Sequence, residues 1–146
     1  MRTSAILSFL VLAVTARAAE KPNIIFILAD DMGYGDCTAN NPGSKIPTPH
    51  IDRLAKEGLQ FTDAHSAATV CTPSRYGLLT GINPAREGIV NPLLKFGSPI
   101  IKEGTPTIAG FLREHGYATK MVGKWHLGWQ MNMASGKAEF DFSRPL

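Results

Sequence analysis

The sequence of 146 residues predicts an α/β fold in which a mainly parallel sheet is flanked by helices. Asn23–Ala29 is an almost unbroken apolar run, which is typical of a strand buried on both faces at the centre of a parallel sheet. Two later segments, Thr48–Ala64 and Thr105–Val122, each place a helical pattern before a strand pattern. Strands and helices that alternate in this way favour a parallel sheet.

The first helix is expected to begin at Thr48 and Pro49, which are a suitable N-cap and first-turn residue. Apolar residues then recur at helical spacing until Gly58, where we expect the helix to end. Leu59–Ala64 follows with the composition of a strand.

The second such unit is expected to start with a helix at Thr105–Pro106, to end that helix at Gly116, and to continue as a strand over Tyr117–Val122. Between the two units, Ser74–Leu79 predicts a short helix after Pro73. Gly81–Glu103 reads as a long loop rich in Gly and Pro. Trp129–Leu146 loses all periodicity and ends without a closing element.

Residues 1–18 have the pattern of a secretory signal peptide. Met1–Arg2 gives a short basic start, Ile6–Val14 is an apolar run, and Ala16–Ala18 is a small-x-small cleavage site. We therefore expect residues 1–18 to be removed and residues 19–146 to be exported as one unit. A signal peptide directs only entry into the export route, so the periplasm, the extracellular space and the lysosome all remain open.

The charge of the mature chain excludes some partners. Removal of Arg2 and Arg17 with the signal peptide lowers the formal charge from +3 to +1. No Lys/Arg block remains to suggest a nucleic acid. No later stretch approaches the roughly 20 apolar residues that a membrane span requires. Nucleic acid and a membrane span are therefore not expected.

Asp30 and Asp31 directly follow the first predicted strand, at the end where open α/β sheets place their ligand crevice. Two adjacent carboxylates repel each other unless a positive charge lies beside them, and hard cations such as Ca²⁺ or Mg²⁺ prefer such oxygen ligands. The pair predicts a metal site. An acidic turn after a strand is the alternative interpretation.

Cys71 precedes a helix that Pro73 starts, and Arg75 lies one turn further on. Exposed N–H groups, the positive end of the helix dipole and a fixed guanidinium favour an anion site there. A thiolate phosphatase would need a longer loop of N–H groups between the Cys and the Arg. A buried structural Cys is the other interpretation. Cys37 is expected to be a loop cysteine, and a disulfide with Cys71 is not required.

Lys124 and His126 alternate with Trp125 in a Gly-Lys-Trp-His-Leu-Gly segment at the end of a predicted strand. In extended backbone the two side chains would point to the same side. A cation and a titratable imidazole would then face an anionic substrate. An exposed strand end would show the same pattern.

Together these segments closely resemble the formylglycine-dependent sulfatases, of the arylsulfatase type. The resemblance rests on Asp-Asp after an apolar strand, on Cys-Thr-Pro-Ser-Arg at Cys71–Arg75 continued to Gly81, and on Gly123–Gly128. Met32–Asp36 and Thr48–Ala55 support it. It covers residues 22–128 in the usual order of the family and implies an alkaline-phosphatase-like fold.

The resemblance implies hydrolysis of a sulfate monoester through a formylglycine nucleophile. A formylglycine-generating or other sulfatase-maturing enzyme would oxidise Cys71 to the aldehyde, and one hydroxyl of its hydrate would attack the sulfur. Asp30 and Asp31 would bind Ca²⁺ in preference to Mg²⁺. Arg75 would hold the hydrated aldehyde, Lys124 would bridge sulfate and nucleophile, and His126 would hydrogen-bond the hydrate or the substrate.

The chain departs from the family in its length. Members bring an Asp-Asn pair, a further Lys and a His from a second half, and none of these is found here. We therefore expect residues 19–146 to be the N-terminal, incomplete part of a sulfatase catalytic domain that is inactive alone. A related metal-dependent phosphoesterase or phosphonate hydrolase, and an inactive truncated product, are the alternatives.

Overall fold

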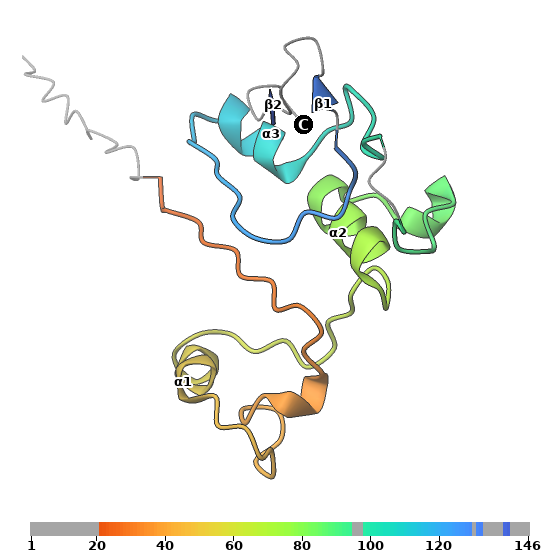
Figure 1. Ribbon diagram of the computed structural model, residues 1–146. Helices are drawn as coiled ribbons and strands as arrows, with labels where there is room; N and C mark the ends of the chain where they lie inside the picture. The colour runs from red at the N-terminus through yellow and green to blue at the C-terminus, as the bar shows by residue number, and fades with distance from the viewer. Residues whose placement is uncertain (1–20, 95–97, 130, 133–138, 141–146) are drawn as a thin grey trace, which may run out of the picture.

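The computed structural model describes residues 21–94, 98–129, 131–132 and 139–140. The expected signal peptide lies outside these residues. The helices are η1 (Tyr34–Asp36), α1 (Pro49–Glu57), α2 (Cys71–Thr80), η2 (Pro84–Glu87) and α3 (Ile108–Glu114), of which η1 and η2 are 3-10 helices, and the strands are β1 (Met131–Asn132) and β2 (Glu139–Phe140). Figure 1 shows η1 and α1 in one group and α2, α3, β1 and β2 in another.

The predicted bounds of α1 are confirmed. Pro49 occupies its first position, where the missing N–H costs nothing. The N–H of Gly58 donates to the Leu54 carbonyl at 2.9 Å and ends the helix. The Thr48 side chain does not cap α1 and instead bonds to the Thr38 hydroxyl at 2.7 Å and to Asp52 Oδ1 at 3.1 Å. These bonds tie the loop after η1 to the start of α1.

Helix α2 begins at Cys71, three residues before the predicted Ser74. Pro73 lies inside its first turn, where no residue needs an N–H for an intrahelical bond, so proline does not delay the start. Gly81 ends the helix in the left-handed region at φ +69°, and its N–H donates to the Gly77 carbonyl at 2.8 Å.

Helix α3 begins later than the sequence predicts. Thr107, rather than Thr105, is the N-cap, and its hydroxyl accepts from the Gly110 N–H at 3.1 Å. A hydroxyl two residues further along therefore takes the capping role. Gly116, at φ +81°, follows the C-cap residue His115, as the pattern predicted.

The three predicted strands Asn23–Ala29, Leu59–Ala64 and Tyr117–Val122 are not formed in this structure. Within the described residues, pairing is confined to β1 and β2, which are antiparallel with Met131 opposite Phe140. A helix satisfies its backbone groups internally, whereas a strand needs a neighbour along its length. Ile25 and Ile27 are 83% and 79% exposed, so the apolar run is present without the layers that would bury it. The parallel sheet stays a prediction.

The segment from Lys21 to Asp30 is nevertheless held at both ends. The ammonium of Lys21 donates to the His115 carbonyl, 94 residues away, and lies 5.8 Å from the centre of the Tyr117 ring. At the other end, Asp30 accepts from Lys124, again 94 residues away. The segments 21–30 and 115–124 therefore run in the same direction with one constant offset.

The core lies between α2 and the later loops. Tyr76, Ile101 and Leu127 are its buried members, and the partly buried hydrophobic residues around them are Leu79, Ile82, Ile89, Ile100 and Trp125. The Ile100 N–H donates to the Leu127 carbonyl at 3.0 Å. This core fixes the segment around Leu127 against α2. Among the described residues, no helix has the length and apolar character needed to cross a bilayer.

Candidate active site

The site is built around the first turn of α2. Cys71 is the first residue of the helix and follows the N-cap residue Val70, which is extended at φ −126°. Its thiol is free and partly buried. The unpaired N–H groups and the positive end of the helix dipole therefore lie at the turn that carries the thiol. This placement agrees with the predicted anion site.

Asp30, Arg75 and Lys124 meet beside this turn. Arg75 Nη2 donates to Asp30 Oδ1 at 2.8 Å, and Lys124 Nζ donates to Asp30 Oδ2 at 2.9 Å. The Arg75 side chain is 10% exposed, whereas those of Lys124 and Asp30 are 40% and 43% exposed. One carboxylate thus lies between a buried cation and a half-exposed cation.

The two cations lower the pKa of the Asp30 carboxyl below its ordinary value, the hydrogen bond from Lys124 contributing most and that from Arg75 next. The same hydrogen bond to Asp30 raises the pKa of Lys124. A Coulombic interaction with Cys71 adds to this rise. Both members of the pair are therefore charged near neutral pH, and Arg75 places a second positive charge beside Asp30.

Arg75 also holds the segment that carries Lys124. Its Nη1 donates to the Lys124 carbonyl at 2.6 Å. Its Nε is buried without a hydrogen-bond partner in the described part of the chain. A guanidinium with a free N–H at the start of a helix is suited to bind an oxyanion.

His126 is placed by backbone contacts. Its Nε2 lies 2.8 Å from the Leu93 carbonyl oxygen, and its own carbonyl accepts from the Thr72 hydroxyl at 2.9 Å. His126 has φ +57°, and Asp31, the neighbour of Asp30, has φ +55°. They are the two described non-glycine residues with positive φ. Such conformations concentrate at functional sites, where the surroundings hold them in place.

The prediction that Lys124 and His126 point to the same side of an extended backbone is wrong. The segment is not extended, because Gly123 at φ +111° and His126 at φ +57° turn the chain. Lys124 reaches Asp30, whereas His126 reaches Leu93. The core contacts of Leu127 hold this turned segment against α2. Both residues still lie beside the first turn of α2, but their side chains bond to different partners.

The donor chemistry of Asp30 and Asp31 suits a hard cation, but the described residues do not complete a site for one. Within the described ranges, no group of three or more His, Cys, Asp or Glu side chains gathers. Ca²⁺ takes six to eight oxygen ligands. Both oxygens of Asp30 accept hydrogen bonds from Lys124 and Arg75. Binding of Ca²⁺ by Asp30 and Asp31 stays a prediction.

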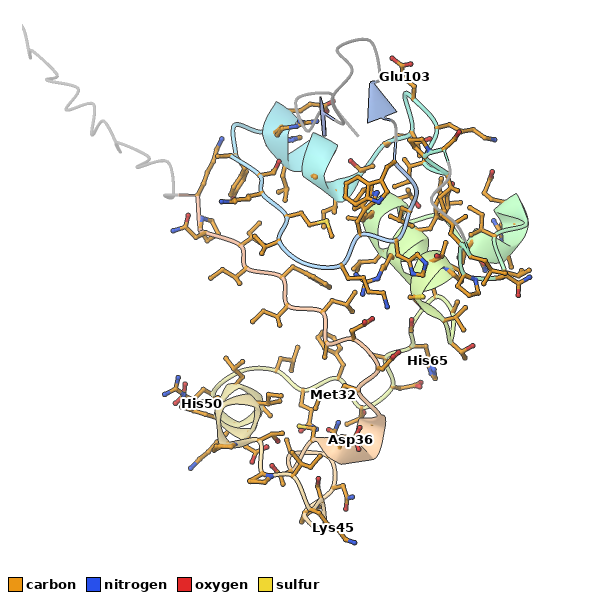
Figure 2. The ribbon with its side chains drawn as sticks, viewed as in Figure 1. Met32, Asp36, Lys45, His50, His65 and Glu103 are labelled. Carbon is orange, nitrogen blue, oxygen red and sulfur yellow. The ribbon has the colours of Figure 1, made fainter. Side chains whose placement is uncertain are left out.

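The remaining histidines lie on the surface. His50 lies on α1 and His65 in the connection between α1 and α2 (Figure 2), and both are exposed. His65 Nε2 is 2.6 Å from Asp63 Oδ1, and the exposed His115 Nδ1 is 2.8 Å from the Phe111 carbonyl oxygen. Cys37 is a free loop cysteine, as predicted, and it is buried beside Asp52.

Two contributors to the site were missed from the sequence. Thr72 is fully buried and also accepts from the Leu93 N–H at 3.0 Å. Thr72 stands inside the conspicuous Cys71–Arg75 segment, but its residue type gives no sign of this role. Leu93 acts through its backbone, so no side-chain pattern reveals it.

Comparison with known proteins gives consistent matches. The family model "Sulfatase" matches residues 22–145. The chain is 49% identical over 110 residues to N-acetylgalactosamine-6-O-sulfatase of Bacteroides thetaiotaomicron, covering 75% of this chain and 21% of that protein. It is 42% identical over 124 residues to mouse arylsulfatase G, covering 85% of this chain and 23% of that protein. It is 45% identical over 123 residues to human arylsulfatase A, covering 82% of this chain and 24% of that protein.

Solved structures agree. One, described with the metabolism of multiple glycosaminoglycans by Bacteroides thetaiotaomicron, matches with a TM-score of 0.69 and 47% identity over 78% of this chain and 24% of that chain. The crystal structure of Ps i-CgsB matches with a TM-score of 0.61 and 43% identity over 84% of this chain and 27% of that chain. These neighbours place the described part within an alkaline-phosphatase-like fold. The chain spans between 21% and 24% of the length of these curated relatives. Its family match extends over nearly all residues after the first 21, and the chain therefore belongs to the sulfatase family.

Proposed function

We propose that the protein hydrolyses sulfate monoesters and that Cys71 is the precursor of its formylglycine nucleophile. The observation that carries the proposal is the meeting of Arg75, Lys124 and the start of α2 around a free, partly exposed Cys71. Membership of the sulfatase family supports the choice of sulfate over other anions.

The charges at the site suit this reaction. A sulfate ester loses its alcohol with negative charge developing on oxygen, and donors already aimed at that position stabilise the transition state. Arg75 is fixed by Asp30 and by the Lys124 carbonyl, so it needs no reorganisation. Lys124 is 40% exposed and would contact the sulfate group of an entering substrate.

The modified Cys71 supplies a hydrated carbonyl that attacks sulfur and later releases sulfate. Arg75 holds the charge around this residue, and His126 accepts or donates a hydrogen bond to the nucleophile or the substrate. Asp30 and Asp31 would hold Ca²⁺, in preference to Mg²⁺, and this cation would add positive charge beside the nucleophile.

Conversion of Cys71 is tested by mass spectrometry of protein expressed from its complete gene, in a host with a sulfatase-maturing enzyme. We expect the peptide with Cys71 to have the mass of the aldehyde or its hydrate. The peptide with Cys37 is the internal control and should keep its thiol. An unmodified Cys71 in material from such a host would refute the proposed nucleophile.

The reaction is tested with paired sulfate and phosphate esters of one alcohol, such as 4-nitrophenol. We expect faster sulfate release, and we expect Cys71→Ala to abolish it while Cys37→Ser retains it. Faster phosphate release would indicate a phosphoesterase, and no turnover of either ester would indicate an inactive product. Because the relatives include arylsulfatases and an N-acetylgalactosamine-6-O-sulfatase, a 6-O-sulfated N-acetylgalactosamine belongs in the panel.

Export is part of the proposal and is tested separately. We expect the mature protein, isolated from the exported fraction, to begin after Ala18. Protein that keeps Met1–Ala18 and stays in the cytoplasm would contradict export.

A further inference from the structure

The hydroxyl of Thr72 joins three segments that are far apart in the sequence. Thr72 is the residue after Cys71 in the first turn of α2, and it is fully buried. Its hydroxyl donates to the His126 carbonyl at 2.9 Å and accepts from the Leu93 N–H at 3.0 Å. One side chain thus satisfies two backbone groups that have little access to water.

A third hydrogen bond joins His126 to Leu93 and closes a ring of three hydrogen bonds. His126 Nε2 lies 2.8 Å from the Leu93 carbonyl oxygen. A carbonyl oxygen only accepts, so Nε2 carries the proton and donates it. In the neutral imidazole, Nδ1 is then the bare acceptor. Nδ1 is buried and has no hydrogen-bond partner within the described residues.

The same ring of hydrogen bonds explains the positive φ of His126. A residue with φ +57° persists only where its surroundings over-determine it. The Thr72 hydroxyl holds the carbonyl of His126, and Leu93 holds its ring. Without the hydroxyl, the carbonyl of His126 and the N–H of Leu93 both lose a partner, and the left-handed conformation loses its support.

We propose that Thr72 is a positioning residue that fixes the tautomer and the place of His126 beside the turn that begins with Cys71. With Nε2 bonded to the Leu93 carbonyl, the buried Nδ1 of His126 is the ring nitrogen left to accept a hydrogen bond. The proposal rests on the proposed function for the identity of the reaction, but the placement of the imidazole is a separate property.

The kinetic test compares Thr72→Val, which keeps the shape and removes the hydroxyl, with Thr72→Ser, which keeps the hydroxyl. The protein is expressed from its complete gene, and rates are divided by the fraction of Cys71 that mass spectrometry shows to be converted. We expect Thr72→Val to lower kcat by roughly ten- to hundredfold with little change in KM, because a small misplacement of a reacting group is costly. Thr72→Ser should recover most of the rate.

Thr80→Val is the matched control. Thr80 lies in the last turn of α2, and its hydroxyl makes the same two kinds of bond, to the Tyr76 carbonyl at 2.7 Å and from the Ile82 N–H at 3.1 Å. It touches neither Leu93 nor His126 in these bonds. A general loss of stability would therefore affect both valine variants alike, whereas a positioning role lowers kcat only in Thr72→Val. Equal kcat values for the two would overturn the proposal.

A second readout needs no activity and no converted Cys71. Nitrogen NMR of ¹⁵N-histidine-labelled protein distinguishes the two nitrogens of each imidazole. At a pH where the imidazoles are unprotonated, we expect the proton of His126 on Nε2 in the wild-type protein and in Thr80→Val, and a mixture of tautomers in Thr72→Val. A proton on Nδ1, or an unchanged single tautomer in Thr72→Val, would overturn the proposal. Absence of sulfate release by the wild-type protein would refute the proposed function alone.

Discussion

Asp30 shows how one side chain at the end of a predicted strand organises the site. Its two oxygens take hydrogen bonds from Arg75 and Lys124, which lie 45 and 94 residues further along the chain. The carboxylate lowers the repulsion between two cations that would otherwise face each other. Arg75 and Lys124 are therefore held in place before any substrate enters.

Asp30→Asn should reduce stability in a pH-dependent manner. The lowered pKa of Asp30 means that its stabilising charge is fully present above the unfolded value of about 4 and is lost as pH falls further. The raised pKa of Lys124 means that its contribution is present below about pH 10.4 and is lost as pH rises further. We expect the difference in the free energy of unfolding between wild type and variant to be constant from about pH 5 to 9 and to shrink outside this window.

Urea unfolding at each pH, with a chelator present, checks this expectation. Asp63→Asn is the control, because the side chain of Asp63 is 90% exposed and should add little stability at any pH. A difference that grows below pH 4 would contradict the assigned hydrogen bonds.

Arg75→Lys should destabilise the protein although it keeps the charge. A lysine cannot reach both Asp30 and the Lys124 carbonyl in the geometry of a planar guanidinium. We expect a loss of about 1.5–3 kcal/mol in the free energy of unfolding, the usual range for a hydrogen bond to a charged group. Thermal or chemical unfolding measures this loss, with the exposed Arg113→Lys as a control that should match wild type.

The residues of the site were predictable where their side-chain chemistry is unusual for a turn. Asp30, Cys71, Arg75 and Lys124 stood at the ends of predicted elements, and the structure brings them together. His126 was paired with Lys124 through an extended backbone that does not exist. Thr72 was not found, because a threonine that bonds only to backbone groups resembles any other buried threonine.

At the scale of elements, the predicted helices form, whereas the three predicted strands do not. The ends of α1 depend on Pro49 and Gly58, which act within a few residues. The start of α2 was misplaced because Pro73 was taken as its first residue, although proline is tolerated throughout a first turn. Strand formation at Asn23–Ala29 depends on neighbours elsewhere, so no local pattern ensures it.

Helix α2 is held close to the segment before it by Gly77. A Cβ at Gly77 would lie 2.6 Å from the Cβ of Ala67, and 3.5 Å from the Ile82 carbonyl oxygen and from Pro84. Gly77→Ala would otherwise favour the helix by about 1 kcal/mol. We expect overpacking to outweigh this gain and to destabilise the protein by about 1–3 kcal/mol in chemical unfolding.

The double variant Gly77→Ala with Ala67→Gly tests the cause. Removing the Cβ of Ala67 should recover most of the lost stability, as a double-mutant cycle would show. Additive losses in the double variant would mean that the close approach of Ala67 is not the reason.

The whole molecule exposes far more apolar surface than a monomeric soluble domain usually does. Among the described residues, Ile25, Ile27, Leu59, Phe61 and Val122 are each more than 70% exposed. Where such exposed apolar side chains form a contiguous patch, they mark an interaction site or a tendency to aggregate. In the relatives, the matched segment makes up only 21–24% of the protein.

Residues 19–146 produced alone should therefore bind a hydrophobic dye, associate in solution and release no sulfate from an ester. Dye fluorescence, size-exclusion chromatography and a sulfate assay measure these three properties. Coexpression with further residues encoded in the same gene, where present, is the control. Turnover by the isolated piece, or a monomer that does not bind the dye, would contradict the expectation.

The constant spacing between residues 21–30 and 115–124 has a consequence for how the gene can change. Adding or deleting one codon between Lys21 and Asp30 would leave only one of the two end contacts intact, since both share the offset of 94. Length variation in these two stretches should therefore be tolerated only when both change together.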